Sequence, residues 1–327
     1  MGALVVGGIT RLTRSGLSIV DWDPLMGVIP PLGHEQWLAA FDHYRQFPEY
    51  QQLRQGMSLG EFQFIFFWEY THRLLARLVG VVFLVPFVFF WLRGYFDRQL
   101  ATRALLLFGL GALQGLMGWL MVLSGLAHRP SVSHFRLAAH LGLAFLIFGY
   151  ALWLARELGV PGPRTFLPAS ARRTLTRGLA LTGTLLGLQI VWGAFVAGLK
   201  AGHYANTFPL MAGRLVPPGL LAFRPAAAAF VENPLTVQWT HRVIGTALLL
   251  AAAWFGVRVR LVGADARSRR LVTGLLVLVA LQYTIGVLTL IHYVPVALGV
   301  THQFLALVVF GTWVLTLHHV RQVTAGD

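Results

Sequence analysis

The sequence has no cysteine and few acidic residues. Its 327 residues include 12 Asp and Glu against 26 Lys and Arg, and charged residues make up only 12% of the chain. The absence of cysteine excludes disulfides, thiolate metal sites, iron–sulfur clusters and cysteine nucleophiles. Metal binding would therefore depend on His, Met or carboxylate side chains. The low charge, with 56% hydrophobic residues and a mean hydropathy of +0.66, is typical of an integral membrane protein.

The net charge of +14 at neutral pH would suggest nucleic acid as the partner of a soluble chain. Here, however, the basic residues lie mostly between long apolar runs, where they orient the chain in a membrane. We therefore expect membrane lipid around the protein and no nucleic acid partner.

Seven apolar runs have lengths close to the roughly 20 residues needed to cross a bilayer. They are residues 62–92, 104–124, 134–155, 178–199, 235–257, 271–290 and 297–317. Residues 1–9 are also apolar but only about half as long as a span. They predict either a truncated first span, with a longer native N-terminus, or an unusually short helix. Counting this segment, the sequence predicts an all-α polytopic membrane protein with eight transmembrane helices.

Basic residues are concentrated in alternate connections between these runs. The three groups are Arg93, Arg98 and Arg103; Arg156, Arg164, Arg172, Arg173 and Arg177; and Arg258, Arg260, Arg267, Arg269 and Arg270. The positive-inside rule places these connections and both termini in the cytoplasm. The opposite connections include two long ones, residues 13–60 and 200–234. The first contains Trp22, Trp37, Tyr44 and Tyr50, and it is either an ordered cap or a disordered connector.

Two pentapeptides are nearly identical and each leads into an apolar run. They are Glu69-Tyr70-Thr71-His72-Arg73 and Gln238-Trp239-Thr240-His241-Arg242. A Leu-Gln-x-x-x-Gly pattern also recurs in the third, fifth and seventh predicted helices, at Leu113-Gln114 with Gly118, Leu188-Gln189 with Gly193, and Leu281-Gln282 with Gly286. A small residue one turn from an amide suits close helix packing, with the amide in an interhelical hydrogen bond.

These repeats predict two parallel, pseudo-repeated four-helix bundles. Residues 1–156 form the N-terminal half, residues 157–177 a cytoplasmic linker, and residues 178–327 the C-terminal half. Since each half has an even number of helices, the second half repeats the orientation of the first. Both halves therefore place their sites on the same side of the membrane.

Each even-numbered helix carries one histidine near its outer end, at His72, His140, His241 and His302. An imidazole in hydrocarbon requires a partner for its polar atoms. Mutual hydrogen bonding and another metal or proton pathway are alternatives, but two histidines in each half are typical of paired axial haem ligands. Further histidines, expected to be solvated or interfacial, are His34, His43, His128, His203, His292, His318 and His319.

The two halves differ at Glu69 and Gln238, each three residues before its histidine and on the same helix face. An ionisable residue near hydrocarbon is a candidate functional group. The structural alternative is an ion pair from Glu69 to Arg73, which leaves unexplained why Gln238 also precedes an arginine, Arg242. Arg73, Arg77, Arg136 and Arg242 suit either haem propionates or phospholipid headgroups.

Several motifs together resemble the haem A synthase family, of the mitochondrial and alphaproteobacterial type. They are Gly7-Gly8-Ile9-Thr10-Arg11-Leu12-Thr13, Ser15-Gly16-Leu17-Ser18, Asp21-Trp22, Gly27-Val28-Ile29-Pro30-Pro31, Trp68-Glu69-Tyr70-x-His72-Arg73, Arg136-Leu137-x-x-His140-Leu141 and Gln238-x-x-His241-Arg242. The resemblance covers nearly the whole chain. Because this sequence has no cysteine, it differs from family members that carry a cysteine pair in the outer loop.

The resemblance implies oxidation of a methyl group of haem O to the formyl group of haem A, through two hydroxylations and loss of water. His241 and His302 would be the axial ligands of a permanent haem b, and His72 and His140 would flank the iron of haem O. Glu69 would act in the chemistry. The implied partners are haem O synthase, an electron donor and the terminal oxidase that receives the product, and a homo-oligomer is compatible with the sequence.

Two other functions fit parts of the sequence. A dihaem cytochrome b for electron transfer would also use two pairs of histidines, but it would not need the difference between Glu69 and Gln238. A transporter built from parallel repeats would have broken helices at midplane. The intramembrane Pro86 has no counterpart in the other half, which disfavours a transporter.

Overall fold

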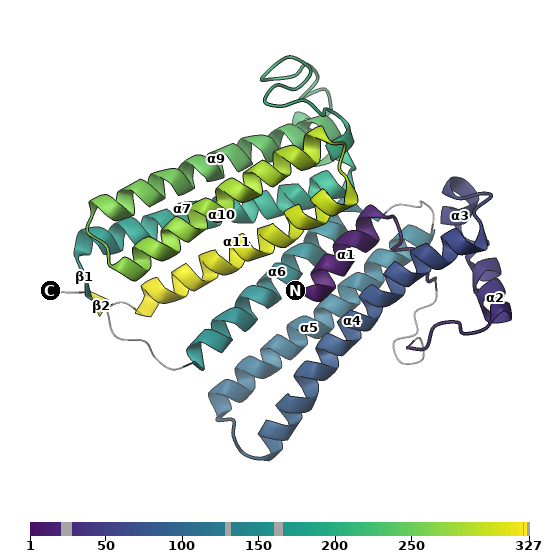
Figure 1. Ribbon diagram of the computed structural model, residues 1–327, viewed down its shortest axis with the longest axis horizontal. Coiled ribbons are helices and arrows are strands. Elements are labelled where there is room, and N and C mark those ends of the chain that lie inside the picture. The colour runs from purple at the N-terminus through teal and green to yellow at the C-terminus, as the bar shows by residue number, and fades with distance from the viewer. Residues whose placement is uncertain (21–27, 128–131, 160–165, 323, 326–327) are drawn as a thin grey trace. The chain divides into compact units, whose positions relative to one another are not determined.

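The computed structural model describes residues 1–327 except 21–27, 128–131, 160–165, 323 and 326–327 (Figure 1). It divides into two compact units, Met1–Ala144 and Phe145–Asp327, with the boundary inside a helix. The only strands in the described residues are β1 (Phe166–Leu167) and β2 (Thr324–Ala325), which pair in parallel. The prediction of an all-α protein is therefore confirmed apart from this short pair.

Seven helices of the described chain are long and apolar enough to cross a membrane. They are α4 (Leu59–Leu92), α5 (Arg98–Ala127), α6 (His134–Glu157), α7 (Ala169–Gly198), α9 (Pro234–Leu261), α10 (Ala266–Ile291) and α11 (Val296–Gln322). Each coincides with one predicted apolar run, so the seven predicted spans are confirmed. The apolar α1 (Gly2–Leu12) has 11 residues, which is too short to cross a bilayer in helical form.

Local sequence signals begin the long helices. Ser58 and Glu61 form a capping box at α4, in which the Ser58 backbone N–H donates to Glu61 Oε2 at 2.8 Å. Asn233 caps α9, with Pro234 at the first helical position. Asp265 accepts backbone hydrogen bonds from Arg267 and Ser268 at the start of α10. The pKa of Asp265 is lowered: burial acts to raise it, but hydrogen bonds from Ser268 and Arg267 and the nearby His319 outweigh that effect.

The first unit joins α1 to the N-terminal end of α4. Thr10 Oγ1 donates to the Trp68 carbonyl at 3.0 Å, which fixes the contact between these two helices. The segment between them contains α2 (His34–Tyr44) and α3 (Pro48–Leu53). Phe41, Tyr44, Phe62 and Ile65 form a buried cluster where α2 packs on α4. The described part of the long loop is thus an ordered cap, while its Trp22 lies outside the described residues.

The second unit has a closely packed core between α7, α9, α10 and α11. Phe255 of α9 lies over Gly178 of α7, where an added Cβ would approach Phe255 Cδ2 to 2.2 Å. Trp313 of α11 covers Gly183 in the same way and donates from Nε1 to the Leu179 carbonyl at 3.0 Å. These glycines therefore allow large aromatic rings to pack directly against the α7 backbone.

A second long connection separates α7 from α9 and contains η1 (Ala201–His203), η2 (Ala226–Ala228) and α8 (Ala229–Glu232). Its backbone carbonyls accept hydrogen bonds from side chains of α9. Thr236 donates to the Leu220 carbonyl, and Trp239 Nε1 donates to the Leu215 carbonyl at 3.0 Å. The connection is thereby anchored to the first two turns of α9.

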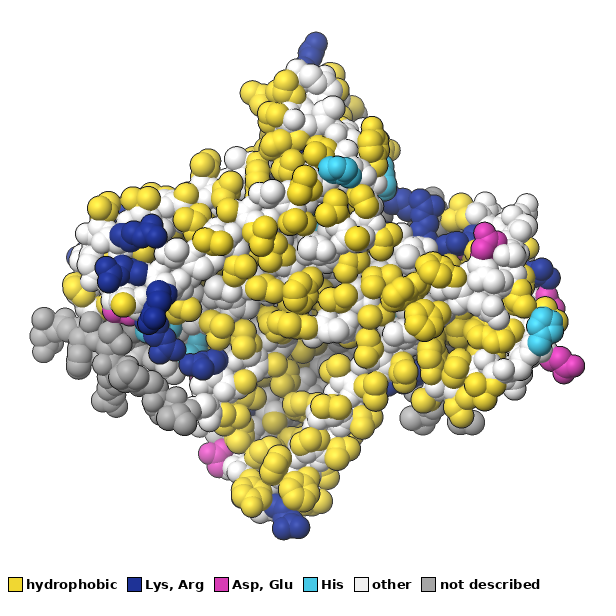
Figure 2. Space-filling view, in the orientation of Figure 1, with side chains coloured by type: hydrophobic (Ala, Val, Ile, Leu, Met, Phe, Trp, Pro, Cys, Tyr) yellow, Lys and Arg dark blue, Asp and Glu magenta, His cyan; other side chains and the backbone are white. Residues whose placement is uncertain are grey.

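Large hydrophobic side chains cover much of the molecular surface. Figure 2 shows them over the displayed face, with Lys and Arg side chains mainly at its margins. On α4, Val79, Val82, Val85 and Leu92 are each more than half exposed. An apolar exterior on long helices is the surface expected of a protein surrounded by lipid, and it confirms the integral membrane assignment.

Candidate functional site

Four predicted histidines lie on four different long helices, and each faces a glycine of the preceding apolar helix. An added glycine Cβ would approach the histidine Cε1 to about 3 Å in every case. The pairs are Gly7 with His72 (2.8 Å), Gly118 with His140 (3.3 Å), Gly193 with His241 (3.2 Å) and Gly286 with His302 (2.8 Å). The absence of a side chain on one helix therefore makes room for an imidazole on the next.

A glutamine lies one turn before three of these glycines and contacts the same histidine. The distance from the glutamine Nε2 to the histidine Nε2 is 3.3 Å between Gln114 and His140, 3.2 Å between Gln189 and His241, and 3.4 Å between Gln282 and His302. The predicted interhelical hydrogen bonding of this motif is confirmed. Ala3 occupies the corresponding position before Gly7, and its backbone hydrogen-bonds to His72.

Each of the four histidines also has one ring nitrogen without a hydrogen-bond partner in the described part of the chain. Nδ1 of His72, His140, His241 and His302 is buried and has no hydrogen-bond partner among the described residues. A buried polar atom without a partner is costly, and a neutral imidazole nitrogen is a good ligand for iron. These four imidazole nitrogens are therefore suitable ligands for haem iron.

The histidines approach one another in two pairs. His72 interacts electrostatically with His140 in the first unit, and His302 interacts with His241 in the second. No group of three or more His, Cys, Asp or Glu residues that could hold a metal ion occurs in the described part of the chain. A tetrahedral zinc site usually needs more protein ligands than such a pair provides, whereas haem iron requires only axial ligands.

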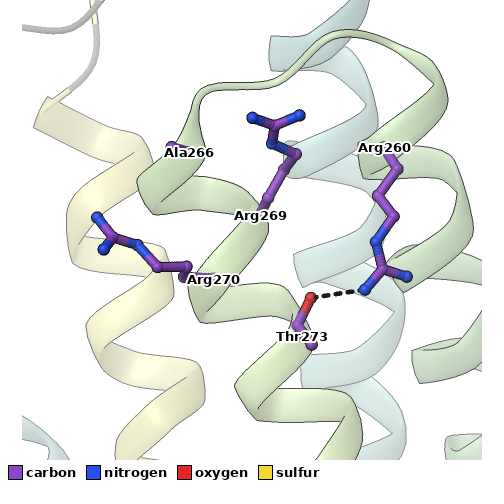
Figure 3. A pocket seen from close by; sticks show the side chains of 5 residues that line it. All are labelled: Arg260, Ala266, Arg269, Arg270 and Thr273. Atoms are coloured by element: carbon purple, nitrogen blue, oxygen red, sulfur yellow. Dashed lines mark hydrogen bonds between the residues drawn. The ribbon is translucent and has the colours of Figure 1, made fainter.

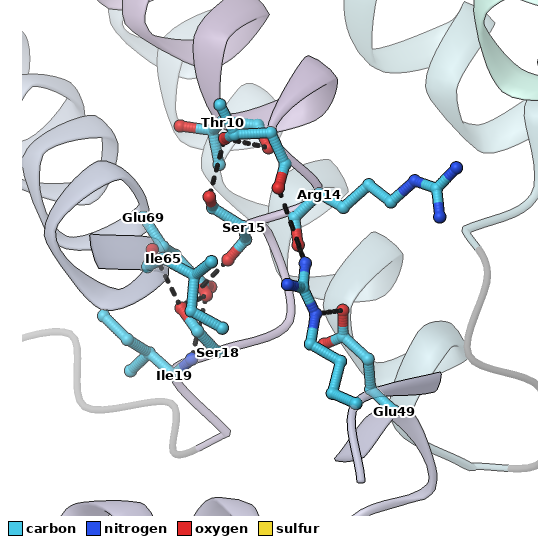
Figure 4. A network of polar contacts seen from close by, with 10 residues as sticks. Thr10, Arg14, Ser15, Ser18, Ile19, Glu49, Ile65 and Glu69 are labelled. Carbon is cyan, nitrogen blue, oxygen red and sulfur yellow. Dashed lines mark hydrogen bonds and ion pairs between the residues drawn. The ribbon is translucent and has the colours of Figure 1, made fainter. Parts of the chain in front are cut away.

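Glu69 is almost fully buried, with 2% exposure, and both of its carboxylate oxygens have hydrogen-bond partners. Oε2 accepts from the Ser18 hydroxyl and from the Ile19 backbone N–H, each at 2.8 Å (Figure 4). Oε1 accepts from Arg73 Nη2 at 2.7 Å and Nε at 3.1 Å. The ion pair anticipated between Glu69 and Arg73 is therefore present.

The matching position in the second unit has no such ion pair. Gln238 is equally buried and donates from Nε2 to the Ala205 carbonyl at 3.2 Å. Arg242 donates to the Ala205 carbonyl at 2.6 Å and to the Thr207 carbonyl at 2.8 Å. Arg73 makes the corresponding bond to the Ile19 carbonyl at 2.7 Å. Each arginine thus connects its helix by hydrogen bonds to the backbone that follows the preceding apolar helix. Arg73 does so beside the carboxylate of Glu69, and Arg242 does so beside the uncharged Gln238.

The residues that hold Glu69 were not singled out individually from the sequence. Ser18 and Ile19 lie some fifty positions before Glu69, and only the quoted Ser15-Gly16-Leu17-Ser18 motif included one of them. Arg136, whose role the sequence left open, donates from Nη1 to the Leu120 carbonyl at 2.8 Å. This bond connects the start of α6 to α5.

Two histidines near the C-terminus differ from expectation. His318 and His319 were expected to be solvated or interfacial, but they are only 4% and 5% exposed. The His318 ring packs edge-on against Trp153, with centroids 4.8 Å apart, and His319 Nε2 lies 3.7 Å from Asp265 Oδ1. The expectation was wrong because packing of α11 against its neighbours covers both rings.

A shallow basic pocket lies at the connection between α9 and α10, lined by Arg260, Ala266, Arg269, Arg270 and Thr273. Arg260 Nη2 donates to Thr273 Oγ1 at 3.1 Å, while the guanidinium groups of Arg269 and Arg270 point in different directions (Figure 3). Because the three guanidinium groups do not point toward a common position, the pocket does not have the geometry of an anion-binding site. It belongs to the basic connections identified in the sequence.

The sequence is similar to known proteins along nearly its whole length. Residues 1–314 match the cytochrome oxidase assembly protein family. A haem A synthase of Rhodospirillum centenum is 48% identical over 320 residues, covering 97% of this chain and 84% of the relative. The haem A synthase of Parvibaculum lavamentivorans is 46% identical, with 98% and 90% covered, and that of Nitrosomonas eutropha is 45% identical, with 94% and 86% covered. The chain therefore belongs to the cytochrome oxidase assembly protein family, and these relatives within it are haem A synthases.

Proposed function

We propose that this chain is the enzyme that oxidises a methyl group of haem O to the formyl group of haem A, for use in a terminal oxidase. Relatives named haem A synthase match nearly the whole chain. The observation that carries the proposal is an asymmetry between two similar histidine sites: the buried carboxylate of Glu69 lies three residues before His72, whereas the uncharged Gln238 lies three residues before His241. A protein that only transferred electrons would not require this asymmetry.

In this proposal the two pairs of histidines bind different haems. His72 and His140 flank the iron of the substrate haem O, and His241 and His302 are the axial ligands of a resident haem b. The unsatisfied Nδ1 atoms and the space provided by the facing glycines support both assignments. Haem b would supply one-electron transfer when bound. Gln189 and Gln282 would orient the ligand rings of that pair.

Glu69 is the residue proposed to act in the oxidation. Converting a methyl to a formyl group removes electrons and protons from the carbon and adds an oxygen atom, so the site needs a group that accepts protons or stabilises positive charge. Glu69 Oε2 is held by Ser18 and Ile19, which fixes the carboxylate in place. Gln238 cannot ionise, which suits a haem that only transfers electrons.

The architecture proposed for this function has two parallel four-helix halves. One contains α1, α4, α5 and α6, and the other contains α7, α9, α10 and α11. The four matching glycine–histidine pairs support this equivalence, because each pair joins helices at corresponding places in the two sets. In this proposal both termini lie in the cytoplasm, which the positive-inside rule supports, and the haem sites lie toward the outer face of a bacterial inner membrane. Haem O synthase and an electron donor are the proposed upstream partners.

The test is co-expression with a haem O synthase, followed by chromatography of the extracted haems. We expect haem A to accumulate only when both proteins are present. If haem O persisted unchanged beside a folded protein loaded with haem b, the proposal would fail. That result would instead favour a dihaem cytochrome b.

A further inference from the structure

A second buried carboxylate lies near Glu69 in the cap of the first unit. Glu49 of α3 is 5% exposed, and its Oε1 lies 3.6 Å from Arg54 Nε at the C-terminal end of the same helix. Its Oε2 is buried and has no hydrogen-bond partner among the described residues. A carboxylate is rarely buried unless a charged group compensates for its lost hydration. Arg54 is that group here.

Arg54 connects Glu49 to the backbone that follows α1. Its Nη2 donates to the Arg14 carbonyl at 2.7 Å and lies 3.4 Å from the Thr13 carbonyl. Arg14 has a φ of 53°, in the left-handed region that a residue with a side chain seldom adopts. The hydrogen bond from Arg54 therefore stabilises an unfavourable turn.

That turn leads directly to the groups that hold Glu69. Thr13 Oγ1 and Ser15 Oγ are 2.6 Å apart, and the Ser18 hydroxyl is 2.9 Å from the Ser15 carbonyl. Ser18 also donates to Glu69 Oε2, as does the backbone of Ile19. Figure 4 shows Glu49 and Glu69 at two ends of this polar network, with the turn between them. The network passes through backbone carbonyls and a guanidinium, so it transmits position and does not form a chain of hydroxyl groups for proton transfer.

We propose that Glu49 and Arg54 are positioning residues for Glu69. The Glu49 carboxylate orients Arg54, which holds the turn at Thr13 and Arg14 and thereby places Ser18 and Ile19 against the Glu69 carboxylate. This inference rests on the proposed role of Glu69 in the oxidation. It gives α3, which lies in the cap of the first unit, a role in positioning the Glu69 carboxylate.

The charge on Glu49 changes near neutral pH. Burial raises its pKa to about 7, an effect opposed by Arg54 and reinforced by Glu69. Three titratable or charged groups face it: Tyr44 of α2, Arg54 at the C-terminal end of α3, and Glu69 of α4. Residues 104–127 of α5, which also contacts α3, contain no charged or titratable side chain. Protonation of Glu49 would weaken its attraction for Arg54, so haem A formation should fall as the pH decreases through about 7.

The decisive experiment compares wild type, Glu49→Gln and Glu49→Asp, each co-expressed with haem O synthase. We expect Glu49→Gln to lower the rate of haem A formation roughly 10- to 100-fold, as misplacement of a catalytic group does, without loss of haem b. The remaining rate should no longer vary near pH 7, and Glu49→Asp should restore part of it. Asp42→Asn removes a carboxylate from an exposed pair with Arg45 and serves as the matched control, with an unchanged rate.

A wild-type rate and pH profile in Glu49→Gln would overturn the inference while leaving the proposed function intact. If Glu49→Gln loses haem b or fails to fold, Arg54→Lys decides instead. Lys keeps the charge but cannot span Glu49 and the turn as a guanidinium does, so a wild-type rate in that variant also overturns the inference. Infrared titration between about pH 6 and 8 gives a readout independent of turnover. A protonated carboxyl band should appear in wild type and be absent from Glu49→Gln, whereas a band retained in that variant contradicts the assignment.

Discussion

Glu69 and Arg73 form a two-point ion pair one turn apart on α4, with Arg73 Nη2 2.7 Å and Nε 3.1 Å from Glu69 Oε1. This pair alone could suggest a purely structural role for Glu69. The second unit argues against that role, because Arg242 ties α9 to the Ala205 carbonyl beside an uncharged Gln238. The helix connection therefore forms without a carboxylate, and the charge at position 69 needs another explanation.

The first prediction is that Glu69→Gln retains the fold and haem b but loses haem A formation. An amide of the same shape can still accept hydrogen bonds from Ser18 or Arg73, but it can no longer take up a proton. We expect a loss of roughly 100-fold or more in rate, which is typical of removing a general acid or base. Haem chromatography measures it, and Gln238→Asn is the control expected to remain active. A fully active Glu69→Gln enzyme would return Glu69 to a structural role.

The second prediction separates the two histidine pairs. His241→Ala and His302→Ala should each remove the resident haem, seen as loss of haem absorbance per mole of purified protein. His72→Ala and His140→Ala should leave that absorbance in place but prevent haem A formation, because they alter the substrate pair. If all four variants lost the resident haem equally, the division of roles between the pairs would be wrong.

The third prediction concerns the glycine that faces His302. In Gly286→Ala the new Cβ would lie 2.8 Å from His302 Cε1, so the ring must move and haem b occupancy should fall severalfold. Gly274→Ala lies on the same helix with no atom within 4 Å of the added Cβ and serves as the control. Haem absorbance per protein is the measurement, and equal occupancy in both variants would contradict the proposed fit.

The fourth prediction tests the packing of the second unit. Gly178→Ala forces a Cβ to within 2.2 Å of Phe255 Cδ2, and overpacking of this kind costs about 1–3 kcal/mol. Gly187→Ala on the same helix meets no neighbouring atom within 4 Å and should be neutral or slightly stabilising. Thermal denaturation in detergent should show a lower midpoint for Gly178→Ala alone, and matching midpoints would refute the packing account.

The fifth prediction is a pH dependence of stability caused by Glu49. Its pKa rises on folding from 4.5 to about 7 because of burial, so the folded state binds more protons than the unfolded state between these values. The free energy of unfolding should therefore decrease as the pH rises through this window, by at most about 3 kcal/mol from this group. In Glu49→Gln the decrease should be smaller. Thermal midpoints measured at several pH values test this, and parallel curves for both proteins would exclude Glu49 as the cause.

The sequence by itself determined the class of the protein, the seven long helices and the residues that repeat between its parts. Apolar runs of membrane length can form helices that satisfy their own backbone hydrogen bonds, so their number and approximate limits follow from composition. The spacing of Gln114 and Gly118, repeated at Gln189 and Gln282, also predicted interhelical amide contacts, because residues one turn apart share a helix face.

Only the tertiary structure decided which groups surround the carboxylate at position 69. Ser18 and Ile19 reach Glu69, and Arg54 reaches the turn at Arg14, through contacts between residues about 40 to 50 positions apart. No local periodicity encodes such contacts, since they depend on how an irregular loop folds over the end of α4. The same reason explains the burial of His318 and His319, which follows from helix packing and cannot be inferred from their place near the chain end.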